Sequence, residues 1–392
     1  MKSKKRKVIT YFLLIIIFTL IILLLFFNGN EILFAVDFSE YWSASRLTLA
    51  GENPYSSEAV MISQQEIGWP YEFPMMMFNP PWAMSLVLPV GLFPYNLGRI
   101  IWLIISVIII LISTNMLWEL YGGSHKRRWV ARILGLTYIP TVIGLDVGQI
   151  APFVLLGLAG FLLYQYQRMW VLAGFFTFLI SIKPQLLYLF WPLLLLWIMN
   201  EKRWVVMWTL LISGLIATAI PVLFNQSILF QYVSEYIINS PLNRWEPPVI
   251  SFALRPIFGM DKHWLQFIPS IIGFFIIIIY WRMKKDNWKW ESHIHFALLL
   301  SVITTSYGWT FDLIVLLPTI IFTTIQFMNQ PKRYISLVLL YILINAIMLF
   351  MLIIGTPEFY GIWIPYAWLI FSVLLYLLTR SKNEVGEANT VY

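Results

Sequence analysis

Long apolar runs alternate with short polar connections along almost the whole chain. A run of about 20 apolar residues can cross the ~30 Å hydrocarbon core of a bilayer as a helix. The pattern predicts about twelve such helices. Their expected ranges are 8–27, 98–120, 133–146, 149–165, 170–182, 185–199, 204–224, 266–283, 294–308, 312–328, 334–354 and 362–379. We therefore expect an all-α polytopic membrane protein, with residues 1–392 forming a single integral membrane domain.

Two longer polar stretches interrupt this alternation, at 28–78 and 225–265, and both fall on the same predicted side of the membrane. The first contains DFSEYWSASRLTLAGENPY, which has helical spacing through Leu49 and then turn residues at 51–54. Residues 78–94 are apolar, but they are short and rich in proline. We interpret this last segment as a re-entrant or interfacial piece.

Composition and charge agree with a membrane protein and give it an orientation. Of the residues, 60% are hydrophobic and 11% are charged, well below the quarter typical of a soluble domain. Taking the N-terminus as cytoplasmic, the cytoplasmic connections hold 20 of the 26 Lys and Arg, as the positive-inside rule expects. The C-terminus is then cytoplasmic too, with a tail at 381–392, and the first apolar run is an uncleaved signal anchor. The expected location is the plasma membrane.

The charge distribution also limits the function. The net charge of +7 comes from clusters between apolar runs, so it does not indicate a nucleic-acid partner. The chain has no cysteine, which excludes thiol nucleophiles and thiolate metal sites. By the same topology 13 of the 19 acids lie outside. We therefore expect any chemistry on the outer face, with membrane lipids as surroundings.

An acid pair follows the first apolar run. Asp37 and Glu40 are three residues apart, so they share one face of the predicted helix. A carboxylate held partly out of water at the membrane surface has a raised pKa and can act as a general base. The alternative is that Asp37 only caps the helix.

Two further candidates lie in turns between short apolar runs. GLDVGQIAPF contains Asp146 and Gln149, which are either ligand-binding residues or ordinary turn residues beside Gly148. SIKPQLL contains Lys183, which either binds an anion such as a lipid phosphate or extends to the interface to reach water.

The remaining candidates are Asp312, Arg244 and Arg255. Asp312 either binds a ligand, pairs with Lys183 or Arg255, or is an ordinary acid at the end of a span. The two arginines of the second outer loop either bind phosphate through paired N–H groups or are solvated. Outer aromatic residues that could stack on a sugar ring include Trp42, Trp69, Tyr71, Trp82, Trp245 and Trp309.

Common catalytic motifs are absent from the sequence. It contains no DxD, HExxH, P-loop or GxSxG pattern, and its histidines show no metal-ligand spacing. A site for a soluble nucleotide-sugar is therefore unsupported, and we predict neither a metal nor a cofactor.

The order of several short motifs is more informative than any one of them. Together they resemble the polytopic glycosyltransferases of family 87, members of the GT-C superfamily, over roughly residues 35–320. In chain order the motifs are the outer acid Asp37, G-x-x-PY at 51–55, Pro80–Pro81, Gly148–Gln149, Ala173–Gly174 with Ile182–Pro184, and Trp309-x-x-Asp312 with 316–318.

The resemblance implies a GT-C-like bundle and a hexosyltransferase, typically a mannosyltransferase. Such an enzyme takes the sugar from a polyprenyl-phosphate carrier, passes it to a glycan or glycolipid acceptor on the outer face, and inverts the anomeric centre. Asp37 matches the family's catalytic base, and Lys183 the lysine near the donor phosphate. Glu40, Gln149, Arg244, Arg255 and Asp312 become substrate-binding candidates. Relatives often carry a histidine shortly before the aspartate at 312, and this chain has none.

Other functions remain open at this point. A transporter or flippase of a lipid-linked sugar would also be polytopic, basic inside and rich in aromatic residues. Such transporters often have internal repeats and polar residues at the membrane midplane. Here no repeat is evident and the polar candidates gather at one surface, which favours an enzyme. The missing histidine keeps an inactive relative as a third interpretation.

Overall fold

The structure is a computed structural model that describes residues 35–238, 246–328 and 330–371. Every regular element in these ranges is a helix, which agrees with the predicted all-α class. The predicted span at 8–27, the second part of the span 362–379 (from residue 372 on) and the 381–392 tail lie outside the described residues.

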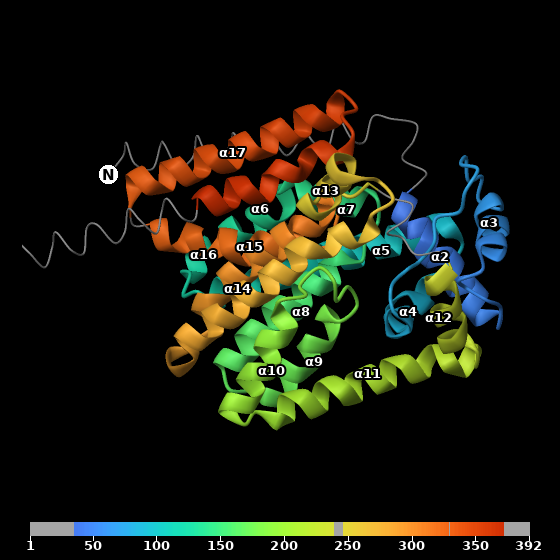
Figure 1. The fold of residues 1–392 in the computed structure, drawn as a ribbon, viewed down its shortest axis with the longest axis horizontal. Helices are drawn as coiled ribbons and strands as arrows, with labels where there is room; N and C mark the ends of the chain where they lie inside the picture. Colours follow the sequence, from blue (N-terminus) through green and yellow to red (C-terminus); the bar gives the residue numbers. More distant parts are fainter. Residues whose placement is uncertain (1–34, 239–245, 329, 372–392) are drawn as a thin grey trace, which may run out of the picture.

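The helices carry the labels of Figure 1. The first half contains α2 (Val36–Leu49), α3 (Ser57–Gln65), α4 (Pro81–Val87), η1 (Leu88–Leu92), α5 (Tyr95–Leu120), η2 (His125–Arg127), α6 (Trp129–Thr137), α7 (Ile139–Asp146), α8 (Ala151–Tyr166), α9 (Trp170–Ile180) and α10 (Phe190–Glu201). The second half contains α11 (Trp204–Phe224), α12 (Ile228–Ile238), α13 (Ile250–Phe258), η4 (His263–Phe267), α14 (Ile268–Lys284), η5 (Lys285–Asn287), α15 (Trp290–Thr304), η6 (Thr310–Leu316), α16 (Leu317–Phe327), α17 (Pro331–Ile353) and η7 (Glu358–Trp363).

Five of the described helices are long and apolar enough to cross a membrane. They are Tyr95–Leu120, Trp204–Phe224, His263–Asn287, Thr310–Phe327 and Pro331–Ile353. The predicted number of about twelve is not confirmed, because several expected spans are shorter helices. For example, α9 has 11 residues and α10 has 12, which at 1.5 Å per residue is about half a bilayer core.

Proline explains two of these interruptions. Pro140 follows the extended residue Tyr138, so the predicted span 133–146 is divided into α6 and α7. Pro184 lies in the turn that separates α9 from α10. Residues 78–94 likewise form only the short helices α4 and η1, together Pro81–Leu92. That length is too short to cross alone, in keeping with the re-entrant or interfacial interpretation.

The first predicted outer loop and the beginning of the second lie together at one end of the molecule. Figure 1 shows α2, α3, α4 and α12 grouped there, with α11 running along one edge from α10 to this group. Asn225 Nδ2 donates a hydrogen bond to the Glu52 carbonyl at 2.7 Å, and the Tyr55 and Tyr232 rings lie 5.3 Å apart. These contacts join 28–78 to 225–265, which agrees with both loops being on one side.

An aromatic core holds the bundle together. Phe161 on α8, Phe190 on α10 and Trp290 on α15 are fully buried, and the Phe161 and Trp290 rings are 4.9 Å apart. Close packing of α5, α8 and α9 completes this layer. The core therefore supports the turns that carry Gln149 and Lys183 and the helices that carry Asp37 and Asp312.

Candidate active site

Asp37 lies in the first turn of α2, close to residue 35, where the described part of the chain begins. The helix runs from Val36 to Leu49, as the sequence predicted. The interpretation of Asp37 as the helix cap is wrong, because the cap is Ala35 and no side chain caps the helix. The backbone N–H groups of Asp37 and Phe38 donate to the Val147 carbonyl at 3.0 and 2.9 Å. The turn after α7 therefore fixes this end of α2.

Gly148 makes that close approach possible. Its φ is +76°, a conformation that favours glycine, and a Cβ at this position would lie 2.6 Å from the Phe38 Cβ. The Gly148 carbonyl also accepts a hydrogen bond from Trp102 Nε1 at 2.7 Å. Gly148 is therefore an ordinary turn residue, as one of the alternatives expected. The turn that it forms also holds the helix that carries Asp37.

Gln149 makes direct contact with the candidate base. Its Oε1 accepts from the Tyr41 hydroxyl and from the Ile150 N–H, both at 2.9 Å. These two donors fix the orientation of the amide, so Nε2 points the other way. Nε2 donates to Asp37 Oδ2 at 2.7 Å. The structure therefore brings Asp37 and Gln149 together and holds one carboxylate oxygen of Asp37 in place.

The surroundings of Asp37 and Glu40 raise the pKa values of these two acids of α2 to different extents. Burial raises the pKa of Asp37 to about 6; the Gln149 hydrogen bond and the charge of Lys183 oppose this rise, while Asp312 adds to it. Glu40 is only 8% exposed, and burial together with the charge of Asp37 raises its pKa well above the ordinary value. With a pKa of about 6, Asp37 is mostly ionised at neutral pH, whereas its surroundings disfavour the ionised form of Glu40, and this difference suits Asp37 as the base.

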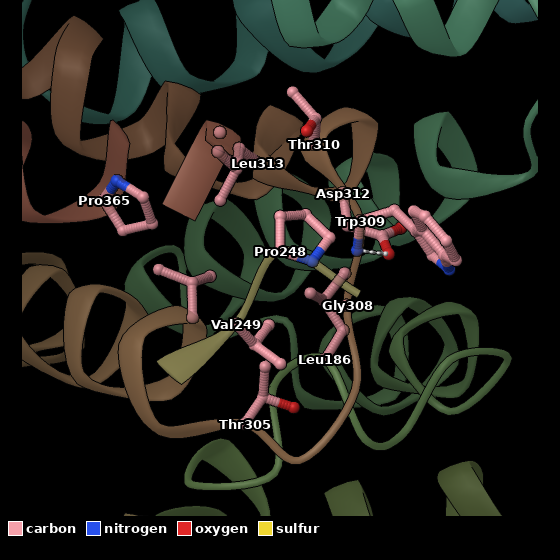
Figure 2. A pocket seen from close by; sticks show the side chains of 12 residues that line it. Leu186, Pro248, Val249, Thr305, Gly308, Trp309, Thr310, Asp312, Leu313 and Pro365 are labelled. Atoms are coloured by element: carbon pink, nitrogen blue, oxygen red, sulfur yellow. Dashed lines mark hydrogen bonds between the residues drawn. The ribbon is translucent and has the colours of Figure 1, made fainter. Parts of the chain in front are cut away.

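Lys183 and Asp312 form a buried ion pair. Nζ lies 2.6 Å from Asp312 Oδ1, and both side chains are less than a tenth exposed. The other oxygen, Oδ2, accepts from the Trp309 N–H at 3.0 Å, the bond drawn in Figure 2. Lys183 therefore does not extend towards water and Asp312 is not an ordinary acid at the end of a span. Their pairing was one of the alternatives that the sequence left open.

The turn that carries Lys183 is held by residues of the proline-rich segment. Asn79 Nδ2 donates to the Ile182 carbonyl and Trp82 Nε1 donates to the Ser181 carbonyl, both at 3.0 Å. Pro80–Pro81 stand out in the sequence, but nothing in the sequence indicates this role of their neighbours Asn79 and Trp82. The paired prolines start α4 at a fixed place, which sets both side chains against the turn before Lys183.

A pocket opens beside the ion pair, and Figure 2 shows the side chains around it. It is partly open to solvent, and its lining side chains leave little free space between them. The wall is largely apolar, with a few polar groups near Asp312. Its lining residues are Leu186, Pro248, Val249, Val302, Thr305, Gly308, Trp309, Thr310, Asp312, Leu313, Gly361 and Pro365. A mostly apolar pocket with a few polar groups is typical of a small-molecule site.

The arginine predictions have different outcomes. The Arg255 guanidinium is buried, donates to the Met260 carbonyl and to Gln266 Oε1, and lies 5.5 Å from the Phe252 ring centre. These contacts hold the turn after α13. Its role towards a substrate stays a prediction. Arg244 lies outside the described residues.

One acid that the sequence did not single out lies near the same groups. Glu358 begins η7, and the charges of Asp37 and Asp312 both act on its carboxylate. Tyr307 is nearby too, because Glu40, Asp312 and Asp37 all act on its hydroxyl, which accepts from Trp309 Nε1 at 2.9 Å. Within the described ranges no group of three or more His, Cys, Asp or Glu side chains is arranged to hold a metal ion.

Helices long enough to span a membrane, together with interacting acids and one buried lysine, define a membrane protein with a candidate active site. Comparison with known families then identifies the class: the sequence model of glycosyltransferase family 87 matches residues 78–306. The chain belongs to this family. Searches of curated proteins and of solved structures give no match. The matched segment includes Gln149, Lys183 and Arg255, whereas Asp37 and Asp312 lie outside it.

Proposed function

We propose that this glycosyltransferase moves a hexose from a polyprenyl-phosphate carrier to a glycan or lipid acceptor on the outer face of the plasma membrane. Mannose is the first sugar to test. Asp37 acts as the general base and the anomeric centre is inverted. One observation carries the proposal. The half-buried Asp37, with a pKa near 6, lies within electrostatic reach of a buried lysine beside a largely apolar pocket.

In the proposed reaction the acceptor hydroxyl attacks C1 of the sugar. Asp37 takes the hydroxyl proton as the new C–O bond forms, while the bond from C1 to the phosphate oxygen breaks. An ionised carboxylate with a pKa near 6 suits this step at neutral pH, and such a base contributes roughly 10²–10⁴-fold to the rate. The bond from Gln149 directs Asp37 without removing its charge.

Lys183 stabilises the charge that develops on the leaving phosphate. An ammonium group has three N–H donors, and Asp312 accepts from Lys183 through one oxygen. The remaining donors are then available to phosphate oxygens, while Asp312 keeps the ammonium in position. The apolar wall formed by Leu186, Val249 and Leu313 suits the first part of a prenyl chain.

A transfer assay on the full-length protein in lipid vesicles tests the proposal. The donor is polyprenyl-phosphate-[³H]mannose or the glucose equivalent, and the acceptors are lipids and glycans extracted from native membranes. Asp37→Asn is compared with Glu72→Gln, which neutralises an exposed acid of the same loop. We expect a labelled product whose formation falls roughly 10²–10⁴-fold in Asp37→Asn only.

Two results would contradict the proposal in different ways. A fully active Asp37→Asn protein would remove Asp37 from the role of base. No product from the parent protein with either donor would reject the donor class. If labelled lipid then crossed the vesicle membrane unchanged, the transporter interpretation would replace the enzyme.

A further inference from the structure

The segment after α17 forms part of the pocket wall. Gly361 and Pro365 line the pocket together with Thr310 and Asp312, as Figure 2 shows for the labelled residues Pro365, Thr310 and Asp312. At Gly361 an added Cβ would lie 3.1 Å from the Thr310 Oγ1, so η7 packs closely on η6. This segment lies outside the region matched by the family.

The other side of η7 is held by the second outer loop. The Phe359 ring lies 5.9 Å from the ring of Phe252, in an edge-on arrangement. Phe252 belongs to α13, which follows Pro248 and Val249 of the pocket wall. Glu358, at the start of η7, is therefore fixed between two elements that both contribute to the pocket.

The Glu358 side chain is exposed, and its carboxylate faces the backbone and hydroxyl of Thr310. Its pKa is raised to about 7, first by partial loss of water and then by the charges of Asp37 and Asp312. Coulomb interactions weaken with distance, so the influence of both acids indicates that they lie in the neighbourhood of Glu358.

This placement differs from that of an ordinary acid at a helix start. An acid there normally gains stability from solvent and from the helix dipole. The charged groups that act on Glu358 are themselves acidic, so its ionised form is disfavoured. Unfavourable placements of this kind are concentrated at functional sites.

We propose that Glu358 is a sugar-binding residue, whose carboxylate accepts hydrogen bonds from hydroxyl groups of a sugar held between Asp37 and the Lys183–Asp312 pair. The inference rests on the proposed sugar transfer. Hexose hydroxyls are donors, and above about pH 7 the Glu358 carboxyl is mostly ionised, so it then accepts stronger hydrogen bonds than a neutral group would. The sugar that Glu358 contacts belongs either to the donor or to the acceptor.

The test uses the full-length protein in vesicles, with polyprenyl-phosphate-[³H]mannose and extracted native acceptors. Glu358→Gln keeps the size and one acceptor oxygen, Glu358→Ala removes both oxygens, and Glu72→Gln is the control. We expect kcat/KM to fall roughly 10- to 100-fold in Glu358→Gln and further in Glu358→Ala, because a bond to a charged group is lost. Glu72→Gln is expected to match the parent.

Two titrations show which sugar is bound. A rise in the KM for the labelled donor assigns Glu358 to the donor sugar. A rise in the KM for the acceptor extract, with an unchanged donor KM, assigns it to the acceptor. Thermal unfolding in detergent at pH 8 is measured alongside, and Glu358→Gln is expected to be at least as stable as the parent, since repulsion is relieved.

The outcomes separate this inference from the proposed function. An active parent with unchanged kinetics in Glu358→Gln would overturn the inference alone, as would a loss of activity that only parallels a loss of stability. An inactive parent would overturn the proposed function, and the inference would fail with it.

Discussion

Two aspartates of the site, Asp37 and Asp312, are placed in contrasting ways. Asp37 is half-buried and receives a hydrogen bond from a neutral amide, and its pKa is about 6. Asp312 is buried and forms an ion pair with Lys183, and its second oxygen accepts a backbone N–H. The first is therefore placed to take up a proton near neutral pH, and the second to hold a cation. Residue type alone would not separate these roles.

The largest expected difference between the two aspartates concerns stability. Asp312→Asn leaves the Lys183 ammonium buried without its counter-charge, which is expected to cost about 3–5 kcal/mol in the free energy of unfolding. Asp37→Asn is expected to be as stable as the parent at pH 8, or more so. Because folding raises the pKa of Asp37 from 3.8 to about 6, its ionisation destabilises the folded state progressively from about pH 4, and the full cost is present above about pH 6. Thermal unfolding in detergent measures both variants.

The double variant Lys183→Met with Asp312→Leu provides the control for that difference. Replacing both partners by apolar side chains is expected to recover most of the stability lost in Asp312→Asn. Sugar transfer is not expected to return, because the ammonium group is absent. Equal stability loss in Asp37→Asn and Asp312→Asn would contradict the distinction between the two aspartates.

A smaller effect is expected at the turn that carries Lys183. Trp82→Phe keeps the ring but removes the hydrogen bond to the Ser181 carbonyl, a loss of about 1 kcal/mol in stability. Trp118→Phe removes a similar bond, to the Ser124 carbonyl, at the far end of α5. We expect kcat/KM to decrease several-fold in Trp82→Phe only. Equal activity in the two variants would show that the bond does not position Lys183.

Part of this site could be predicted from the sequence. The helix through Leu49 followed from its spacing and its turn residues, and Lys183 and Asp312 stood out because isolated charges in apolar surroundings need partners. The contact between Gln149 and Asp37 was not predictable, since it depends on how the Gly148 turn packs on α2.

Glu358 was missed for a similar reason. It is one acid in a short aromatic segment, and only tertiary packing places it near Asp37 and Asp312. The number of membrane-spanning helices was also not predictable from the hydropathy pattern. Hydropathy registers an apolar run, but it does not show where proline breaks the helix, as at Pro140.

The pH dependence of sugar transfer tests the central claim, that Asp37 is the general base, most directly. The experiment measures kcat/KM in vesicles for two variants, the single variant Glu358→Gln and the double variant Glu358→Gln/Gln149→Leu. Both lack the Glu358 carboxyl, so its titration does not contribute to the pH profile. A base must be deprotonated, so the rate is expected to rise with pH around a midpoint near 6. Loss of the Gln149 hydrogen bond, which favours the ionised carboxylate, is expected to move that midpoint to higher pH. A rate that is flat across this range, or a midpoint unmoved by Gln149→Leu, would contradict the assignment of Asp37.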